Sequence, residues 1–567
     1  MDDLTLAKLA VARAINTTHL RDFFDLADAL TAAKSITAAI ASLSNRQVDS
    51  LRAVIEGRKP DAKVVGELVD LALVDKIENG YVAFDYAANC LQELADANPT
   101  RLISIISDEC ALLLEEVDRD SWLAIFDVIQ ALTELVFDLE HRYIREVGKR
   151  GVGLPDIKRL ANHLRKPNDY AKQVFELAIV AELAAVNGGR WQLGVNYEKW
   201  LDWNNADRWA HLAKTWLAIL GEAGARELHD INAGESLTRK LQSSYRFADL
   251  AVNSRINRIA SLADLIGLVS SEQATSWFGT TVKGKLAEAK KLAASGLPAP
   301  TEKLIVQADL TLIAPNPLPT EIEIKLRRIA DTEQIGMAST YRMSALSVSH
   351  GLESGMSAAE IRGLLERLSD KPLPQPMDYL LREAEQRFGR LRVANNKGNS
   401  LVTSDDSILL AEIQNNQKLR PLALHFSEKG DLHSRFEPDL VYYALRDAGY
   451  VAIRVDANNK VISPSSTTER AEVIEVARSV QGDIQRLRDQ DSKLGSEPDD
   501  DDLLRQIQLA IKNKAKALVT VTGAKGETIE YLIEPVGLAN GRLRAKDRKA
   551  DIERTLPLSS VISIVLQ

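Results

Sequence analysis

Two clusters of lysine and arginine are the side chains in this sequence best suited to a chemical task. The first lies within residues 142–166, which hold eight basic and two acidic residues. Its members are Arg142, Arg145, Lys149, Arg150, Lys158, Arg159, Arg165 and Lys166. The second consists of Arg542, Arg544, Lys546, Arg548 and Lys549. Clustered guanidinium and ammonium groups neutralise phosphates largely without regard to base sequence. We therefore predict that these two clusters, the first and second basic islands, bind nucleic acid.

The sequence offers no comparable set of residues for catalysis. A P-loop needs the pattern G-x-x-x-x-G-K-[S/T], whose backbone amides hold phosphates, and neither 148–150 nor 284–286 supplies it. No G-x-S-x-G elbow or dinucleotide fingerprint occurs. The eight histidines and two cysteines show no zinc spacing. We predict that the protein is not an enzyme and has no catalytic residues, metal or cofactor.

The charge of the chain needs to be resolved along its length. The formal total of −9 excludes a uniformly basic surface but not local basic patches. Each island follows an acidic block: residues 101–141 hold two basic and ten acidic residues, and residues 481–502 hold three and eight. Residues 167–299 sum to only +1. We expect the acidic blocks to mask the islands until DNA or a partner competes. The alternative is a first island that is simply a basic surface packed against 101–141.

Length and composition predict a soluble protein of several domains. A chain of 567 residues corresponds to roughly three to five domains of about 100–200 residues each. Cys90 and Cys110 are too few for a disulfide framework, which favours a reducing compartment. The acidic start, Asp2-Asp3, is unlike a signal peptide, and no apolar run reaches the length of a membrane span. We predict a cytoplasmic protein without a membrane partner.

The N-terminal residues predict short helices followed by a hairpin. Apolar residues recur at helical spacing through most of 1–73. Asn79-Gly80 between two short apolar arms is typical of a two-residue hairpin turn. Helices plus a hairpin suggest that 1–100 is a helical, winged-helix-like domain.

Residues 101–299 predict a second helical domain with its own winged-helix-like module. Residues 101–141 favour a long, acidic, amphipathic helix. The glycines of 151–153 end that helical stretch, and Pro155 suits the first turn of a helix over 155–164. Asp169 is expected to cap a helix that extends to about Val186, ahead of another hairpin.

Tryptophan is concentrated in this second domain. Five of the seven tryptophans fall within 26 residues, at Trp191, Trp200, Trp203, Trp209 and Trp216. An aromatic platform for unpaired bases is one interpretation. A helical core is favoured, because Leu212 and Leu220 extend the face shared by Trp209 and Trp216. Residues 286–303 read as a linker that ends the helical half.

The C-terminal half predicts a change of architecture. Residues 300–480 favour an α+β domain, with a strand over 304–314, a helix near 320–330 and a capping box at Ser357–Glu360. The acidic segment 481–502 reads as a solvated tether. Residues 503–567 read as a small β-rich domain with strands at 517–521 and 530–533.

Residues 300–460 resemble the N-terminal domain of XPB-type DNA-repair helicases. The resemblance rests on Ile305–Asp309, Thr340–Ser347, Pro374-Gln375-Pro376 and Arg387–Leu391, which occur in family order. In those helicases this domain is non-catalytic and is linked to engaging distorted DNA or partner proteins. The whole chain is similar to a bacterial, actinobacterial-type helicase-associated protein. The resemblance implies a possible XPB-type helicase as partner.

The last segment resembles a WYL domain, a small SH3-like barrel of bacterial regulators. The resemblance rests on Tyr531–Pro535, Gly541–Asp547 and Arg554–Leu558. Leu543-Arg544-Ala545 stands where the family has Trp-Tyr-Leu, and Ser560 stands at a family arginine. A barrel with a basic strand edge is expected to hold phosphates.

Together these patterns predict a mixed, α-rich, multidomain fold. It comprises a helical winged-helix-like N-terminal half, an α+β helicase-N-terminal-like domain and a small C-terminal SH3-like β-barrel. The favoured function is a non-catalytic DNA-associated accessory protein that works with an XPB-type helicase in DNA repair or transcription-linked processes. Two alternatives stay open: a WYL-type transcription regulator with winged-helix DNA binding, and an interaction scaffold that does not bind DNA.

Overall fold

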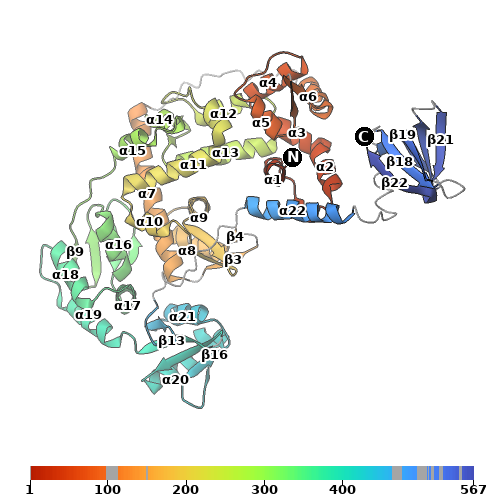
Figure 1. Ribbon diagram of the computed structural model, residues 1–567. Helices are drawn as coiled ribbons and strands as arrows, with labels where there is room; N and C mark the ends of the chain where they lie inside the picture. Colours follow the sequence, from red (N-terminus) through yellow and green to blue (C-terminus); the bar gives the residue numbers. More distant parts are fainter. Residues whose placement is uncertain are drawn as a thin grey trace. The chain divides into compact units, whose positions relative to one another are not determined.

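The protein is described by a computed structural model that mixes helix and strand, with helix predominating (Figure 1). The structure describes residues 2–78, 80–97, 113–142, 144–148, 151–396, 398–462, 476–494, 507, 510–511, 516–522, 528–539, 541–547 and 552–566. The chain forms two compact units. The first comprises Met1–Ile40, Asp49–Asp96 and Ile474–Gln567, and the second comprises Ala41–Val48 and Ala97–Val473.

The N-terminal segment is a run of short helices followed by a hairpin, as predicted, and then by one further helix, α6. Its elements are α1 (Asp3–Ala12), η1 (Thr17–His19), α2 (Phe23–Thr31), α3 (Ala33–Ala41), α4 (Asn45–Ile55), α5 (Val65–Asp70), β1 (Val74–Ile77), β2 (Gly80–Ala83) and α6 (Asp85–Ala97). Strands β1 and β2 are antiparallel, and Ile77 pairs with Gly80. The hairpin is confirmed, although Asn79 itself lies outside the described residues.

Helix α22 (Val476–Leu494) belongs to the first unit and corrects the prediction of a solvated tether over 481–502. Its apolar residues Val480, Ile484 and Leu487 recur at spacings of four and three and are buried against α1 and α2. Asp483 accepts a hydrogen bond of 2.7 Å from the Thr17 hydroxyl. The helix forms because one face is apolar, a feature that the segment's net charge conceals. Residues 495–502 lie outside the described residues.

The C-terminal segment forms a five-stranded antiparallel sheet. Its elements are β18 (Ala517–Thr522), β19 (Thr528–Ala539), β20 (Arg542–Asp547), β21 (Ile552–Pro557), η4 (Leu558–Ser560) and β22 (Val561–Leu566). The strand order is β21-β20-β19-β18-β22, and within the described ranges the edge strands β21 and β22 do not pair with each other. The strands are therefore confirmed, but the predicted SH3-like barrel is not seen as a closed barrel in these ranges.

The helical part of the second unit is built around the long helix α7. The elements are α7 (Leu114–His141), β3 (Ile144–Val147), β4 (Gly151–Val152), α8 (Leu154–Leu164), α9 (Asn168–Val180), β5 (Ala184–Asn187), β6 (Arg190–Leu193), α10 (Tyr197–Asp202), α11 (Asn205–Glu227), α12 (Leu237–Ser244), α13 (Leu250–Leu265), β7 (Val269–Ser270), β8 (Gln273–Ala274), α14 (Phe278–Val282) and α15 (Leu286–Ala294). More than half of α7 is buried. Residues 101–112 of the predicted helix lie outside the described residues.

Three local predictions in this part are wrong. Residues 151–153 follow a strand, β3, and include β4, rather than directly ending a helix. Helix α9 ends at Val180, because Glu182 adopts a left-handed conformation and Val186 then lies in β5, and Asp169 sits in the first turn instead of capping it. Residues 286–294 are helix α15, whose Ala289 and Ala293 are buried, and not linker.

The tryptophans form a core and no aromatic platform. Trp191, Trp200, Trp209 and Trp216 are buried, and Trp203 packs against the same cluster. The indole N–H groups of these four buried tryptophans all find acceptors: those of Trp209 and Trp216, for example, donate to the carbonyls of Ile266 and Ile259 at 2.9 Å. Satisfied donors allow large aromatic side chains to be buried at little cost.

Residues 304–455 form two further sheets with covering helices. The elements are β9 (Ile305–Val306), β10 (Thr311–Ala314), α16 (Thr320–Ile329), β11 (Asp331–Gln334), β12 (Ser339–Arg342), α17 (Ala345–Glu353), α18 (Ala358–Leu368), α19 (Gln375–Arg387), β13 (Leu391–Asn396), β14 (Asn399–Ser404), α20 (Ser407–Asn415), η2 (Gln417–Leu422), β15 (His425–Phe426), β16 (Leu432–Ser434), α21 (Pro438–Asp447) and β17 (Ala452–Val455). The sheets have the orders β11-β12-β10-β9 and β15-β16-β14-β13-β17.

Local signals located two of these elements correctly: α16, predicted near 320–330, and α18. The capping box of Ser357 and Glu360 starts α18, as predicted. The predicted single strand over 304–314 is instead two strands, β9 and β10. The chain turns between them at Leu310, which has a φ of 71° and prevents a continuous extended backbone.

Candidate nucleic-acid interface

Three of the six described cations of the first basic island form ion pairs with acidic residues, mainly those of α7. Arg159 forms ion pairs with Asp138 at 2.9 Å and with Asp156 at 2.6 Å. Lys166 Nζ lies 2.6 Å from an oxygen of Asp127. Arg142 Nε lies 2.9 Å from another oxygen of Asp138. For these three cations the structure supports the alternative interpretation, a basic surface packed against the acidic stretch.

The remaining described cations of the island face solvent. Arg145 on β3, Lys158 on α8 and Arg165 at the end of α8 are exposed. They form no ion pair with any residue that the structure describes. Lys149 and Arg150 lie outside the described residues. The first island therefore offers fewer available charges than the sequence suggests.

The second basic island is a row of exposed cations along one strand. On β20, the side chains of Arg542, Arg544 and Lys546 are exposed, and the residues between them are buried. The two-residue period of a strand places the three cations on one face of the sheet. Arg548 and Lys549 lie outside the described residues.

The neighbouring strands give these cations different surroundings. Arg544 pairs across the sheet with Gly537 and Thr555, which carry no charge, whereas Lys546 pairs with Glu534 and Glu553. Directly opposed charges on one sheet face attract each other, so Lys546 is partly neutralised and Arg544 is not. Arg542 likewise lies opposite Ala539 and Pro557. The available positive charge on β20 therefore concentrates at Arg542 and Arg544.

A buried polar junction joins α7 to α16 and was missed by sequence reasoning. The side chain of Arg327 on α16 is only 1% exposed. It forms ion pairs with Glu134 on α7 and with Glu323 one helical turn earlier, the latter at 3.0 Å. It also donates a hydrogen bond of 2.7 Å to Gln130. Burial alone would raise the pKa of Glu134, but the charge of Arg327 and a hydrogen bond from His163 lower it to about 2.

A second buried arginine, Arg446, contributes to the same junction. Arg446 on α21 forms an ion pair with Glu353 on α17, and its guanidinium donates to the carbonyl of Leu346 at 3.0 Å. The hydroxyl of Tyr442 donates to the second oxygen of Glu353 at 2.6 Å. Arg446 and Tyr442 lie 93 and 89 residues from Glu353 in the sequence, so no local spacing predicts these two contacts. Glu323 with Arg327, and Tyr442 with Arg446, are each four apart on one helix and are pairs that spacing could have suggested.

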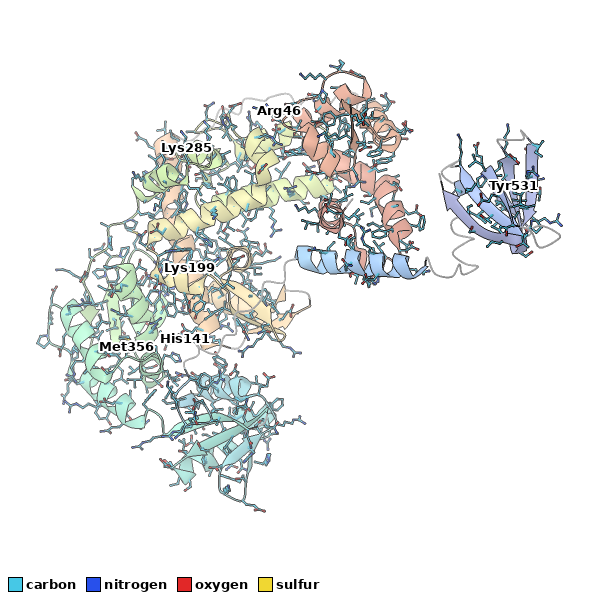
Figure 2. All side chains as sticks on the ribbon, viewed as in Figure 1. Arg46, His141, Lys199, Lys285, Met356 and Tyr531 are labelled. Carbon is cyan, nitrogen blue, oxygen red and sulfur yellow. The ribbon has the colours of Figure 1, made fainter. Side chains whose placement is uncertain are left out.

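Between the two arginines lies a cavity of about 240 Å³ lined by a stacked pair of histidines. The rings of His141 on α7, labelled in Figure 2, and His350 on α17 lie parallel with centroids 4.1 Å apart. Burial, together with the nearby charge of Arg446, lowers the pKa of His141 to about 3. Burial and the neighbouring His141 lower the pKa of His350 well below its usual range. Both imidazoles are therefore neutral at pH 7.

We expect acid to destabilise the second unit through these histidines. A histidine whose pKa is lower in the folded than in the unfolded state stabilises the fold above about pH 6.5, and this stability is lost as pH falls toward the folded pKa. For one such histidine the loss is about 2 kcal/mol between about pH 7 and about pH 5. Urea unfolding at both pH values, followed by tryptophan fluorescence, measures it, because all seven tryptophans lie within 122–277 in the second unit.

The matched variants are His350→Gln and His425→Gln. The first removes a buried histidine whose pKa is lowered by folding and should shrink the pH dependence of the unfolding free energy. The second removes an exposed histidine of the same unit and should leave the pH dependence unchanged. If the unfolding free energy of His350→Gln depends on pH as strongly as that of the parent protein, His350 is not a source of the acid destabilisation.

One comparison bears on the segment that contributes α16 and α17 to this junction. Residues 304–428 match the family of the helicase conserved C-terminal domain. The match runs from β9 to β15 and gives the segment helicase-related character, which suggests association with nucleic acid. No curated protein matches the chain.

Membrane-spanning helices and metal sites are the other features that the sequence predicts to be absent. In the part of the chain that is described, no helix combines the length and apolarity needed to cross a membrane. Over the same residues, no group of three or more histidine, cysteine or acidic side chains is arranged to hold a metal ion.

Proposed function

We propose that the protein is a non-catalytic, DNA-associated accessory protein that works with an XPB-type helicase in DNA repair or transcription-linked processes. The observation that carries the proposal is the helicase-type match of residues 304–428 in a sequence without a P-loop. The exposed row on β20 supplies a site where phosphates would bind electrostatically and with little regard to sequence. A cytoplasmic location fits this role.

The proposal is tested by fluorescence anisotropy with single-stranded, duplex and forked DNA over a range of salt concentrations. We expect the logarithm of the association constant to fall linearly with the logarithm of the salt concentration, because each phosphate contact releases counterions. If none of these DNAs binds even at low salt, the DNA role fails and an interaction scaffold remains. Capture from cells with the full chain then asks whether an XPB-type helicase co-purifies.

Substitutions on β20 locate the binding surface. Arg544→Ala should weaken binding to all DNAs and reduce the salt slope by about 1, because it removes one phosphate contact. Lys546→Ala is the matched control on the same strand face. Its charge is already offset by Glu534 and Glu553, so its effect should be clearly smaller. Equal effects of the two substitutions would reject β20 as the phosphate-binding surface.

A second candidate function, a WYL-type transcription regulator, is favoured by the connectivity of residues 114–193. The order helix α7, strand β3, helices α8 and α9 and hairpin β5-β6, with β3 paired to β6, is the order expected of a winged helix and supports this candidate. Selection from random duplexes distinguishes this function, because a regulator would enrich particular sequences and a sequence-tolerant accessory protein would not.

A further inference from the structure

The second unit contains a second copy of the connectivity just described. We call residues 114–193 the α7–β6 module and residues 205–274 the α11–β8 module. The latter has helix α11, an extended segment, helices α12 and α13 and hairpin β7-β8, in that order. Its extended segment pairs with β8, as β3 pairs with β6: Ser236 bridges Gln273, and the amide of Ala274 donates to the carbonyl of Glu235 at 2.9 Å.

The two modules also share the turn that joins the third helix to the hairpin. After α9, the amide of Leu183 donates to the carbonyl of Ala178 at 2.8 Å, and after α13, that of Leu268 donates to Ala263 at 2.8 Å. Both leucines are fully buried. In each case a left-handed residue, Glu182 or Gly267, precedes the leucine. Such helix ends fix the angle at which the hairpin leaves the helix, so α13 holds the position in its module that α9 holds in the other.

Helix α13 differs from α9 in what it presents to solvent. Its exposed side chains include Arg255, Asn257 and Arg258, and no acidic residue occurs between its N-cap, Asp249, and Asp264. These three side chains form no hydrogen bond or ion pair with any residue that the structure describes. Residues 236–261 hold five basic residues and one acidic residue, a local excess that the near-neutral sum over 167–299 conceals.

The exposed residues of α13 are of the types that recognise the edges of DNA bases. Arginine binds the O6 and N7 acceptors of guanine, and asparagine binds adenine, when a helix lies in the major groove. Leu250, at the first turn, is 87% exposed and is suited to an apolar contact such as a thymine methyl group. Helix α9, in contrast, carries Asp169 and Glu176, which would repel phosphates.

We propose that α13 binds in the major groove of duplex DNA through Arg255, Asn257 and Arg258. In the winged-helix arrangement the third helix is the one that enters the groove, and its charge and residue types are complementary to the duplex. This inference rests on the association with nucleic acid proposed above, but it names a different site from β20, a preference for duplex over single strands and a dependence on base sequence that the β20 site does not have.

The test compares three variants of the full chain by anisotropy with a duplex and a single strand of the same sequence. Arg255→Ala with Arg258→Ala should weaken duplex binding at least about tenfold, with a much smaller effect on the single strand. Lys199→Ala with Lys285→Ala removes the same charge from exposed positions elsewhere in the second unit and should leave binding unchanged (Figure 2). Arg255→Lys with Arg258→Lys should restore phosphate attraction but not base preference.

The results separate this inference from the proposed function. Loss of duplex binding in the Arg255/Arg258 variant, with single-strand binding largely kept, supports α13, whereas Arg544→Ala should weaken binding to both. Unchanged duplex binding in the Arg255/Arg258 variant overturns the inference, and if Arg544→Ala then weakens binding, the proposed function still stands. No binding by the parent protein rejects both. All the substituted side chains are exposed, so far-ultraviolet circular dichroism should show an unaltered fold.

Discussion

Replacing Arg327 with alanine is expected to cost the second unit about 3–5 kcal/mol of unfolding free energy. The guanidinium is almost fully buried between Glu134 and Glu323, whose side chains are 12% and 5% exposed. Its removal leaves two carboxylates in a poorly solvated site without their counter-charge. Urea unfolding followed by tryptophan fluorescence reports the change, because every tryptophan lies in the second unit.

A surface pair provides the control for this prediction. Arg387 pairs with Glu383 at 2.7 Å on α19, but its side chain is 59% exposed. Arg387→Ala should therefore cost less than about 1 kcal/mol, since solvent screens an exposed pair. Combining Arg327→Met with Glu134→Gln and Glu323→Gln should recover much of the stability that Arg327→Ala loses, because no orphaned charge remains. A triple variant as unstable as Arg327→Ala would attribute the loss to packing instead.

The parts of the fold that the sequence predicted correctly depend on signals within a few residues. The Asn79-Gly80 turn predicts the β1-β2 hairpin, and the Ser357–Glu360 box predicts the start of α18. Such signals act through local backbone hydrogen bonds, so no distant residue is needed to interpret them. The single strand predicted over 304–314 failed because one left-handed residue, Leu310, is enough to break an apolar run.

The candidate sites were less predictable, because charge in a sequence does not show which charges meet. Arg159 and Lys166 contributed to a strong basic island, yet they neutralise Asp138 and Asp127 of α7. The alternation on β20 was readable in principle, since cations two apart share a strand face. The net charge of 167–299 does not reveal the basic face of α13, because acidic residues elsewhere in that range cancel its positive charge.

Helix α22 likewise shows that the charge of a segment does not predict its contacts in the fold. Its acidic residues suggest a solvated segment, and its apolar stripe of Val480, Ile484 and Leu487 has a partner more than 450 residues earlier in the chain. Deleting the acidic segment 481–502 would therefore not test whether it masks the second island. Removing Ile484 and Leu487 would open the core formed with α1 and α2, so substitution of the exposed acidic residues is the appropriate test.

Leu487→Ala is expected to weaken the packing of α22 on the N-terminal helices by about 2–5 kcal/mol. The side chain is fully buried beside Ala7, Ala10 and Leu26, and its truncation removes contacts and leaves a cavity. Because the chain has several folded parts, the readout is local: amide hydrogen exchange in α1 should accelerate at least about 30-fold. Gln485→Ala, an exposed substitution on the same helix, should change exchange little. If Leu487→Ala leaves α1 equally protected, α1 keeps its fold without α22, and the joint core of the first unit is rejected.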